Sequence, residues 1–305
     1  MAVIEDGVSS ELTEALGRIA GAIEETLAGI LSNAEGEGPE ATLLEAMRYA
    51  TLGGGKRLRP FLVVATAGLF DVPETVSIRV GAAVELVHCY SLVHDDLPCM
   101  DDDQLRRGKP SCHARFGEAT AILAGDALVP LAFEVLADTA THPDAAVRSD
   151  LVVRLAHAAG AGGMVGGQMI DLAAENLDLD IGSITRLERL KTGALIEFCC
   201  AAGGILGRAD DKAQRALSAY AHDLGLAFQI ADDLLDAEGK VEQVGKAVGK
   251  DAGRGKATFV AILGPAKARD QARLLACQAA AHLDAFGDSA RLLRQLASYM
   301  VGRSQ

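Results

Sequence analysis

The stretch Val84–Pro110, VELVHCYSLVHDDLPCMDDDQLRRGKP, joins an apolar run to five aspartates and then to a block of cations. The apolar run ends near Val93, and Pro98 interrupts the acidic part. A solvated surface can carry such charges, but here they follow directly on a segment with the composition of a buried helix. This order predicts a functional site at the end of an apolar helix.

The composition predicts a compact globular protein. The chain has 305 residues, of which 50% are hydrophobic, so it can bury a large core. Its 29 Lys and Arg against 42 Asp and Glu give a net charge of −13, which argues against nucleic acid or an anionic membrane as the main partner. Tryptophan is absent and aromatic residues are few, so base stacking is not supported.

The sequence predicts neither a membrane span nor a secretory signal. Ionisable residues such as Asp126, Arg154 and Glu197 interrupt the long apolar stretches. The N-terminal sequence MAVIEDGVSSEL has no basic start followed by an apolar block. We therefore expect a cytoplasmic protein.

The cysteines follow no metal-binding or disulfide pattern. They lack CxxC spacing and a compact framework, so we expect buried free thiols rather than zinc ligands. They are Cys89, Cys99, Cys112, Cys199, Cys200 and Cys277.

Helical periodicity recurs along the chain, whereas alternating strand patterns and Asn-Gly hairpin turns are missing. We predict an all-α fold of long helices in a single domain, residues 1–305. The glycine-rich segment Gly160–Gly167 is expected to allow close packing or a kink, since no strand precedes it. The expected helices are Glu11–Leu31, Glu40–Ala50, Glu74–Leu97, Glu118–Asp138, Ala145–Leu172, Ser183–Leu206, Asp211–Leu235 and Ala266–Ala285.

A second acidic motif, QIADDLLD, ends another helical run. Asp232 and Asp236 are four residues apart, so their carboxylates share one helix face, about 5–6 Å apart. A divalent cation would remove their repulsion, and oxygen-only ligands favour Mg²⁺, which also accepts phosphate oxygens and water.

In the first motif Asp95, Asp96 and Asp101 are the candidate ligands. Pro98 breaks the helix there, so the chain can bring Asp101 back toward Asp95.

Cations gather next to these acidic motifs. They lie in GGGKRLRP (Lys56, Arg57, Arg59), LRRGKP (Arg106, Arg107, Lys109), LKTGAL (Lys191, Thr192) and VGKAVGKDAGRGKAT (Lys246, Lys250, Lys256). Each group alone can be a solvated loop, but an acidic protein that collects cations beside Mg²⁺ ligands suggests polyphosphate binding. Arginine clamps phosphate through paired donors, and lysine adds a mobile charge. We therefore predict a pocket that handles diphosphates.

With the two motifs HDDLPCMDDDQLRRGKP and FQIADDLLD, the chain resembles the trans-isoprenyl diphosphate synthases (polyprenyl synthetases), specifically the bacterial farnesyl diphosphate synthase type. The resemblance extends from GGGKRLRP to GKATF, about two thirds of the chain. It implies a central cavity between the helices, a homodimer, and three Mg²⁺ ions between the acidic motifs and an allylic diphosphate.

The resemblance also implies residue roles. The implied metal ligands are Asp95, Asp101 and Asp232, supported by Asp96 and Asp236. The implied isopentenyl diphosphate contacts are Lys56, Arg59, His88 and Arg107, and those of the allylic substrate are Arg106, Lys191, Thr192, Gln229, Lys246 and Lys256. The expected catalytic set is Asp95, Asp96, Asp101, Arg106, Lys191, Asp232 and Lys246.

The product length can be argued from Tyr90 and Ser91, which lie five and four residues before Asp95. On one helix they lie about 6–7.5 Å from Asp95, farther from the diphosphate site. A tyrosine there is bulky enough to close the far end of the cavity, as its floor. In the resembling family, an aromatic at this point and a two-residue insertion around Cys99 accompany a C15 product. We predict farnesyl diphosphate, with geranylgeranyl diphosphate (C20) as the alternative and an ordinary core role for Tyr90 as the competing interpretation.

Two other classes of protein could carry these motifs. A terpene cyclase or diphosphate hydrolase also uses Mg²⁺-binding carboxylates, but it handles one diphosphate and needs no second cation set. A non-catalytic regulatory subunit of the same fold can lose an aspartate motif freely, whereas both motifs are intact here.

Overall fold

Helices dominate the residues that the computed structural model describes, 9–32, 38–174, 179–238 and 258–302. The first half contains α1 (Ser10–Ile30), α2 (Pro39–Thr51), α3 (Leu58–Gly68), α4 (Glu74–Asp95), α5 (Cys112–Phe116), α6 (Glu118–Ala137) and α7 (Ala145–Ala159). The second contains α8 (Met164–Ala174), α9 (Ile181–Glu188), the π-helix η1 (Arg189–Gly193), α10 (Ala194–Leu206), α11 (Asp211–Glu238), α14 (Phe259–Leu263), α15 (Pro265–His282), the 3₁₀-helix η2 (Asp284–Ala290) and α16 (Arg291–Gly302). The predicted all-α fold is confirmed.

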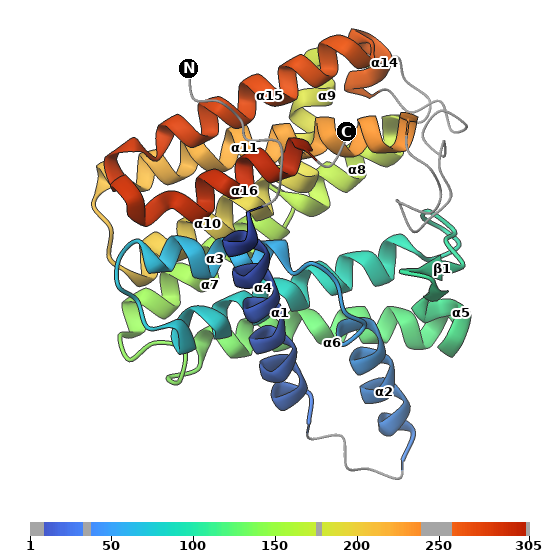
Figure 1. The fold of residues 1–305 in the computed structure, drawn as a ribbon. Coiled ribbons are helices and arrows are strands. Elements are labelled where there is room, and N and C mark those ends of the chain that lie inside the picture. The colour runs from blue at the N-terminus through green and yellow to red at the C-terminus, as the bar shows by residue number, and fades with distance from the viewer. Residues whose placement is uncertain (1–8, 33–37, 175–178, 239–257, 303–305) are drawn as a thin grey trace.

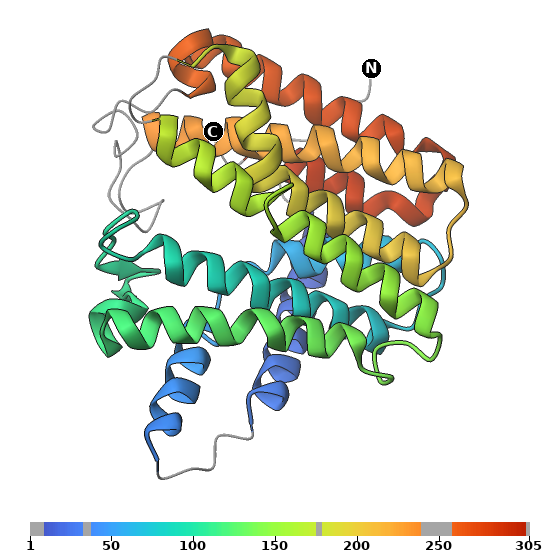
Figure 2. The same cartoon turned by 180° about the vertical axis from the view of Figure 1, so that it is seen from behind.

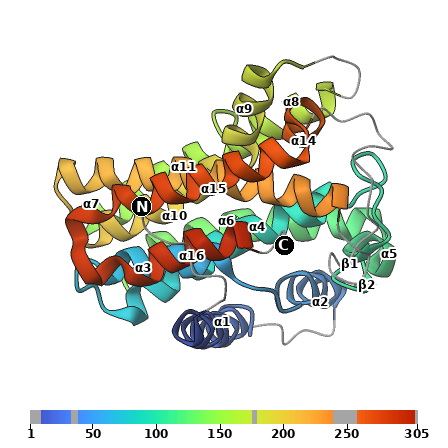
Figure 3. The same cartoon turned by 45° about the horizontal axis from the view of Figure 1, so that its top comes forward.

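The long helices lie side by side in layers (Figure 1). α11, α15 and α16 form one side, α4 and α6 form the opposite side, and α3 and α10 lie between them (Figure 1). Seen from behind, α6, α7, α8, α9 and α10 face the viewer (Figure 2). α1 and α2 project from this stack. The C-terminal ends of α4 and α11 lie at the same end of the molecule, together with α5, α8, α9 and α14 (Figure 3). This arrangement brings the two acidic motifs to one end of the bundle.

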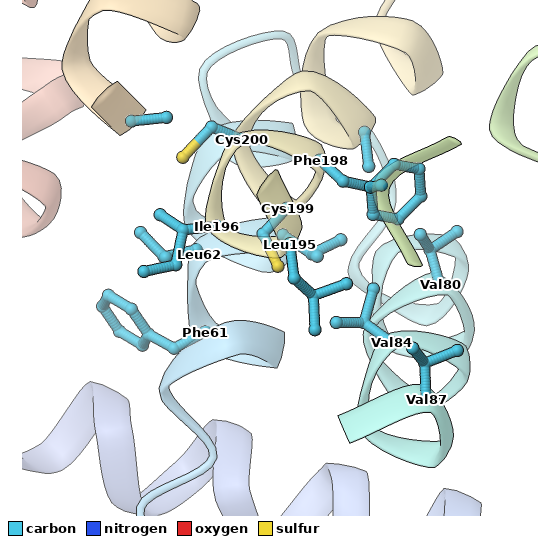
Figure 4. Packing of buried hydrophobic residues seen from close by; sticks show 14 of the residues in the cluster. Phe61, Leu62, Val80, Val84, Val87, Leu195, Ile196, Phe198, Cys199 and Cys200 are labelled. Carbon is cyan, nitrogen blue, oxygen red and sulfur yellow. The ribbon is translucent and has the colours of Figure 1, made fainter. Parts of the chain in front are cut away.

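Part of the hydrophobic core lies where α3, α4 and α10 meet (Figure 4). Phe61 and Leu62 of α3, Val84 of α4, and Ile196 and Cys199 of α10 are all buried there. α4 is buried on most of its faces because helices pack around it, so its sequence is apolar almost all round. One hydrophobic cluster extends from α1 to α16, and the single-domain assignment stays a prediction.

Two predicted helices are interrupted. The expected helix Ala145–Leu172 is two helices, because the chain breaks at Gly160–Gly163 between α7 and α8. The expected helix Ser183–Leu206 contains η1, a π-helical turn between α9 and α10. The helices α3, α5, α14 and α16 and the antiparallel hairpin of β1 (Leu105–Arg106) and β2 (Lys109–Pro110) were not predicted, because their apolar patterns are short.

The cysteine prediction is correct for four of the six residues. All six are free, and Cys89, Cys112, Cys199 and Cys200 are buried. Cys99 and Cys277 are exposed, the first in the loop after α4 and the second on α15. Their exposure could not be predicted, because composition does not show which residues lie on the surface.

Among the described residues, two helices are, by length and composition alone, apolar enough to cross a membrane, although each contains ionisable residues, such as Glu85 in α4 and Asp126 in α6. In α4 the bundle buries 67% of the apolar window, which identifies a core helix. In α6 only 39% is buried, and Ile122 and Leu123 are 43% and 56% exposed. α6 therefore carries an uncovered apolar face.

Candidate active site

The first acidic motif folds back on itself at the end of α4. The helix ends at Asp95, and the backbone N–H of Asp101 donates to the backbone carbonyl of Asp95 across 2.8 Å. Burial raises the pKa of Asp95 to about 6; Lys191 opposes this shift and the neighbouring Asp101 adds to it. The two carboxylates therefore form a concentration of negative charge that a cation would relieve.

Asp96 takes a different position from its neighbour. Its buried carboxylate accepts hydrogen bonds from the guanidinium of Arg106, including one of 3.0 Å from Nε to Oδ1. Asp103 lies 3.7 Å from the same guanidinium. Arg106 sits on the β1–β2 hairpin, so these two aspartates fix the hairpin against the end of α4. Asp96 thus orients Arg106, a cation that is a candidate for binding the substrate.

The second acidic motif lies near the end of α11. Asp232 and Asp236 are partly exposed and share one helix face, whereas Asp233 is buried. Asp233 accepts from Gln229 Nε2 across 3.1 Å and from the backbone N–H of Phe259 across 3.0 Å. Asp233 therefore holds α14 and the Gln229 side chain, while Asp232 and Asp236 remain the candidate ligands.

η1 lies between the two acidic motifs. Thr192 Oγ1 donates to Gln229 Oε1 across 3.3 Å, which ties η1 to α11. Lys191 Nζ lies 2.5 Å from Asp171 Oδ2 of α8, and its charge acts on Asp95 of α4. A Cβ at Gly167 would lie 2.2 Å from the Lys191 backbone nitrogen, so α8 packs directly on η1.

The sequence interpretation missed Asp171. It is the one ionisable residue in the described helix α8, and its partner Lys191 is distant in sequence. A lone carboxylate in an apolar helix was the available signal. The glycine-rich segment was interpreted correctly, since it gives both a chain break and close packing.

A second set of cations gathers around His88. Arg59 Nη1 lies 3.5 Å from His88 Nε2, and the guanidinium of Arg107 lies against Gly55. The pKa of His88 is lowered well below its ordinary value by burial and then by the charges of Arg59 and Arg107. Arg59 Nε is buried and, among the described residues, has no hydrogen-bond partner. This set has the donors to receive an anion.

Lys56 lies at the edge of this second set. It is exposed, and its Nζ stands 5.9 Å from the ring centre of Tyr299 in α16. The next residue, Arg57, does not join the set, because its guanidinium is buried against Glu24 and Glu85. Lys246 and Lys256 lie outside the described residues.

Tyr90 and Ser91 lie on α4 before the first motif. The half-buried Tyr90 ring meets the edge of the His94 ring, with centroids 5.7 Å apart. His94 Nε2 lies 3.1 Å from the carbonyl oxygen of Ile122 in α6, which fixes the imidazole. Ser91 Oγ donates to the His88 carbonyl across 2.9 Å and adds no bulk. Tyr90 therefore packs against His94, and His94 is tied to α6.

The described carboxylates fit a metal ion that takes some of its ligands from the protein and the others from a bound substrate. No group of three or more His, Cys, Asp or Glu in the described part of the chain is arranged to hold a metal ion by itself. The acidic motifs supply oxygen ligands in ones and twos, and Mg²⁺ commonly takes one or two carboxylates and completes its shell with phosphate and water.

Comparisons with known proteins agree with this geometry. The polyprenyl synthetase family model matches residues 40–292. The farnesyl diphosphate synthase of Escherichia coli K12 is 46% identical over 271 residues, which are 86% of this chain and 90% of that protein. Geranylgeranyl pyrophosphate synthase 11 of Arabidopsis thaliana is 42% identical over 86% of this chain and 75% of its own length. The crystal structure of an FPP/GFPP synthase from Zymomonas mobilis has a TM-score of 0.88 and 51% identity, covering 95% of this chain and 99% of that one.

Proposed function

Because the chain belongs to the polyprenyl synthetase family, we propose that it is a prenyltransferase that makes farnesyl diphosphate. It joins isopentenyl diphosphate head to tail (1′-4) with dimethylallyl or geranyl diphosphate and releases diphosphate. The observation that supports the proposal is that the described cations gather in two sets, one with Lys191 and Arg106 beside the first acidic motif and one with Arg59 and Arg107 around His88. A cyclase or hydrolase would need only one.

The first anion site takes the allylic diphosphate. Lys191, Thr192 and Gln229 line it from η1 and α11, and Arg106 reaches it from the hairpin. Asp171 and Asp96 hold Lys191 and Arg106 in place through ion pairs. The second anion site, formed by Lys56, Arg59, His88 and Arg107, takes isopentenyl diphosphate.

Farnesyl diphosphate synthases of this family generally use divalent metal ions. We assign Mg²⁺, three ions per site, to Asp95, Asp101 and Asp232, with Asp96 and Asp236 in supporting positions. When bound, the ions act as Lewis acids that stabilise the departing diphosphate. Asp96 supports through Arg106, since its carboxylate faces that guanidinium.

The residues of the chain supply orientation and charge for the reaction. Arg106 and Lys191 stabilise negative charge on the allylic diphosphate as its carbon–oxygen bond breaks. The double bond of isopentenyl diphosphate then forms the new carbon–carbon bond, and the released diphosphate accepts the proton lost from the condensed cation. The apolar helices must align the two chains and exclude water from the cation.

We assign a C15 product because Tyr90 lies five residues before Asp95 and is held by His94. An elongating chain that starts at the diphosphate site and grows along α4 meets this ring after about 7.5 Å of helix. Geranylgeranyl diphosphate remains the alternative product. The cytoplasmic location stays a prediction.

The uncovered face of α6 supports a homodimer. An apolar helix with exposed Ile122 and Leu123 would bury that face against a second copy of the chain. The test is the mass in solution by light scattering, which should be twice 31.7 kDa.

The function is tested by incubating purified protein with Mg²⁺, isopentenyl diphosphate and either dimethylallyl or geranyl diphosphate. The alcohols are then analysed by mass after dephosphorylation. A dominant C15 alcohol supports the proposal, and C20 or longer products keep the chemistry but reject the Tyr90 floor. Release of diphosphate without elongation indicates a cyclase or hydrolase. An inert folded protein indicates a regulatory subunit.

A further inference from the structure

Arg57 lies within the cationic segment GGGKRLRP but points away from the other cations. Its fully buried guanidinium forms ion pairs with Glu85 of α4 and Glu24 of α1. Its Nη2 also donates to the backbone carbonyl of Thr51 at the end of α2 across 2.6 Å. A single side chain thus connects three helices at the start of α3.

The backbone of Arg57 is left-handed, with φ of 45°. This conformation costs a residue with a Cβ about 1–2 kcal/mol, so the surrounding contacts must hold it. It lets the exposed Lys56 and the buried Arg57, adjacent in sequence, point to different environments. Arg59 follows two residues later and reaches His88.

Glu85 and His88 are three residues apart on α4, about 4.5 Å along the helix axis and on one face. The ion pair that fixes Arg57 to Glu85 therefore also fixes the segment from Lys56 to Arg59 relative to His88. Burial alone lowers the pKa of Arg57, but the Glu85 and Glu24 carboxylates outweigh it and the pKa is raised. The guanidinium stays charged.

Stability alone does not account for this arrangement. A buried ion pair can often be replaced by apolar side chains without loss of stability, whereas it specifies one geometry. The geometry specified here is the spacing between the cations on α3 and the histidine on α4.

We propose that Arg57, held by Glu85 and Glu24, is a positioning residue for the isopentenyl diphosphate half of the site. It sets the spacing of Lys56 and Arg59 from His88 and Arg107, and it contacts no substrate itself. The proposal rests on the proposed function, which assigns those four residues to isopentenyl diphosphate.

The test compares Arg57→Lys, Glu85→Gln and Glu24→Gln with the wild type. KM is measured separately for isopentenyl diphosphate and for geranyl diphosphate, together with kcat, and isopentenyl diphosphate binding is measured by calorimetry. Arg79→Lys is the matched control, because Arg79 lies on α4, as Glu85 does, and pairs with Asp138 and Thr141, away from His88.

Arg57→Lys and Glu85→Gln should each raise KM and Kd for isopentenyl diphosphate about tenfold, because they displace the residues proposed to bind it. Glu24→Gln should raise them about two- to threefold, since one carboxylate remains on the guanidinium. KM for geranyl diphosphate should stay within about twofold in all three, and Arg79→Lys should change neither KM. Glu24→Gln keeps the test available if the buried variants do not fold, because Glu24 is partly exposed.

A purely structural Arg57 would lower the amount of active enzyme and leave both KM values unchanged, which would overturn the proposal. Lys56→Ala separates this result from a failure of the proposed function. If the wild type does not elongate, the proposed function fails. If the wild type elongates but Lys56→Ala leaves KM for isopentenyl diphosphate unchanged, the assignment of these residues to isopentenyl diphosphate fails, and the positioning role fails with it. If the wild type elongates, Lys56→Ala raises KM for isopentenyl diphosphate, and the three variants keep the wild-type KM, only the positioning role of Arg57 is wrong.

Discussion

Asp101 is joined to Asp95 by a backbone hydrogen bond of 2.8 Å, although six positions separate them in the sequence. A continuous helix would place two residues at this separation on different faces, about 9 Å apart along the axis. The turn at Pro98 instead returns the chain to the end of α4. The acidic pair therefore depends on the helix ending at Asp95.

Asp101→Asn should lower kcat by about 10²- to 10³-fold, because it removes the negative charge of a proposed metal ligand beside Asp95. Asp102→Asn is the matched control, since Asp102 is exposed and its side chain accepts from Gln104. Asparagine also tolerates the positive φ of that position. Initial rates at saturating substrates measure both variants, and equal losses in the two would contradict the assignment.

Most of the candidate site could be predicted from the sequence because its chemistry lies in short motifs. The pattern of carboxylates and Pro98 predicts the folded-back pair of Asp95 and Asp101, which the backbone hydrogen bond between them confirms. The spacing of Asp232 and Asp236 predicted a shared helix face, which α11 provides.

The rest depends on contacts between distant segments. The sequence predicts that Arg57 belongs with the cations of its own segment, since nothing local indicates that Glu24 and Glu85 enclose it. The partner of Lys191 is Asp171, on another helix. The π-helical turn at η1 leaves the apolar periodicity nearly unchanged, so the pattern predicted one continuous helix there.

Tyr90→Ala should extend the product beyond C15, because it removes the ring that is held against His94. Tyr90→Phe is the control that keeps the ring and should keep C15. Mass analysis of the dephosphorylated alcohols with geranyl diphosphate as starter measures both. A C15 product from the alanine variant would show that another residue sets the length.

The cysteines should react with a thiol reagent in two classes. Burial raises the pKa of Cys89 and Cys199 to about 12 and that of Cys112 to about 11, so at pH 8 these thiols are protonated as well as inaccessible. Cys200 is buried in the same way. Titration of the native protein with a chromogenic disulfide should show two rapid thiols. The double variant Cys99→Ser/Cys277→Ser should show none, and rapid reaction of a third thiol would contradict the burial.

Stability should fall in acid partly through His88. Its pKa in the folded protein lies well below the ordinary 6.5, so the unfolded chain binds a proton more readily as the pH drops through 6.5. The contribution of His88 is therefore complete above that pH and is lost toward the folded-state pKa, with a slope of at most about 1.4 kcal/mol per pH unit. Urea unfolding between pH 5 and 7 should show a shallower loss in His88→Gln than in the wild type. Parallel curves would mean that His88 is not held neutral.

Gly167→Ala should reduce activity although alanine favours helices. The added Cβ would lie 2.2 Å from the backbone nitrogen of Lys191, so η1 must move away from α8. That movement shifts Lys191 and Thr192 from their contacts with Asp171 and Gln229, and KM for geranyl diphosphate should rise about tenfold.

Gly21→Ala in α1 is the control for Gly167→Ala, because nothing lies within 4 Å of its added Cβ. It should stabilise the protein by about 0.5–1 kcal/mol through helix propensity and leave both KM values unchanged. Thermal unfolding and steady-state kinetics on both variants decide the matter. If Gly167→Ala also gains stability and keeps its KM, the close approach of α8 and η1 does not position Lys191.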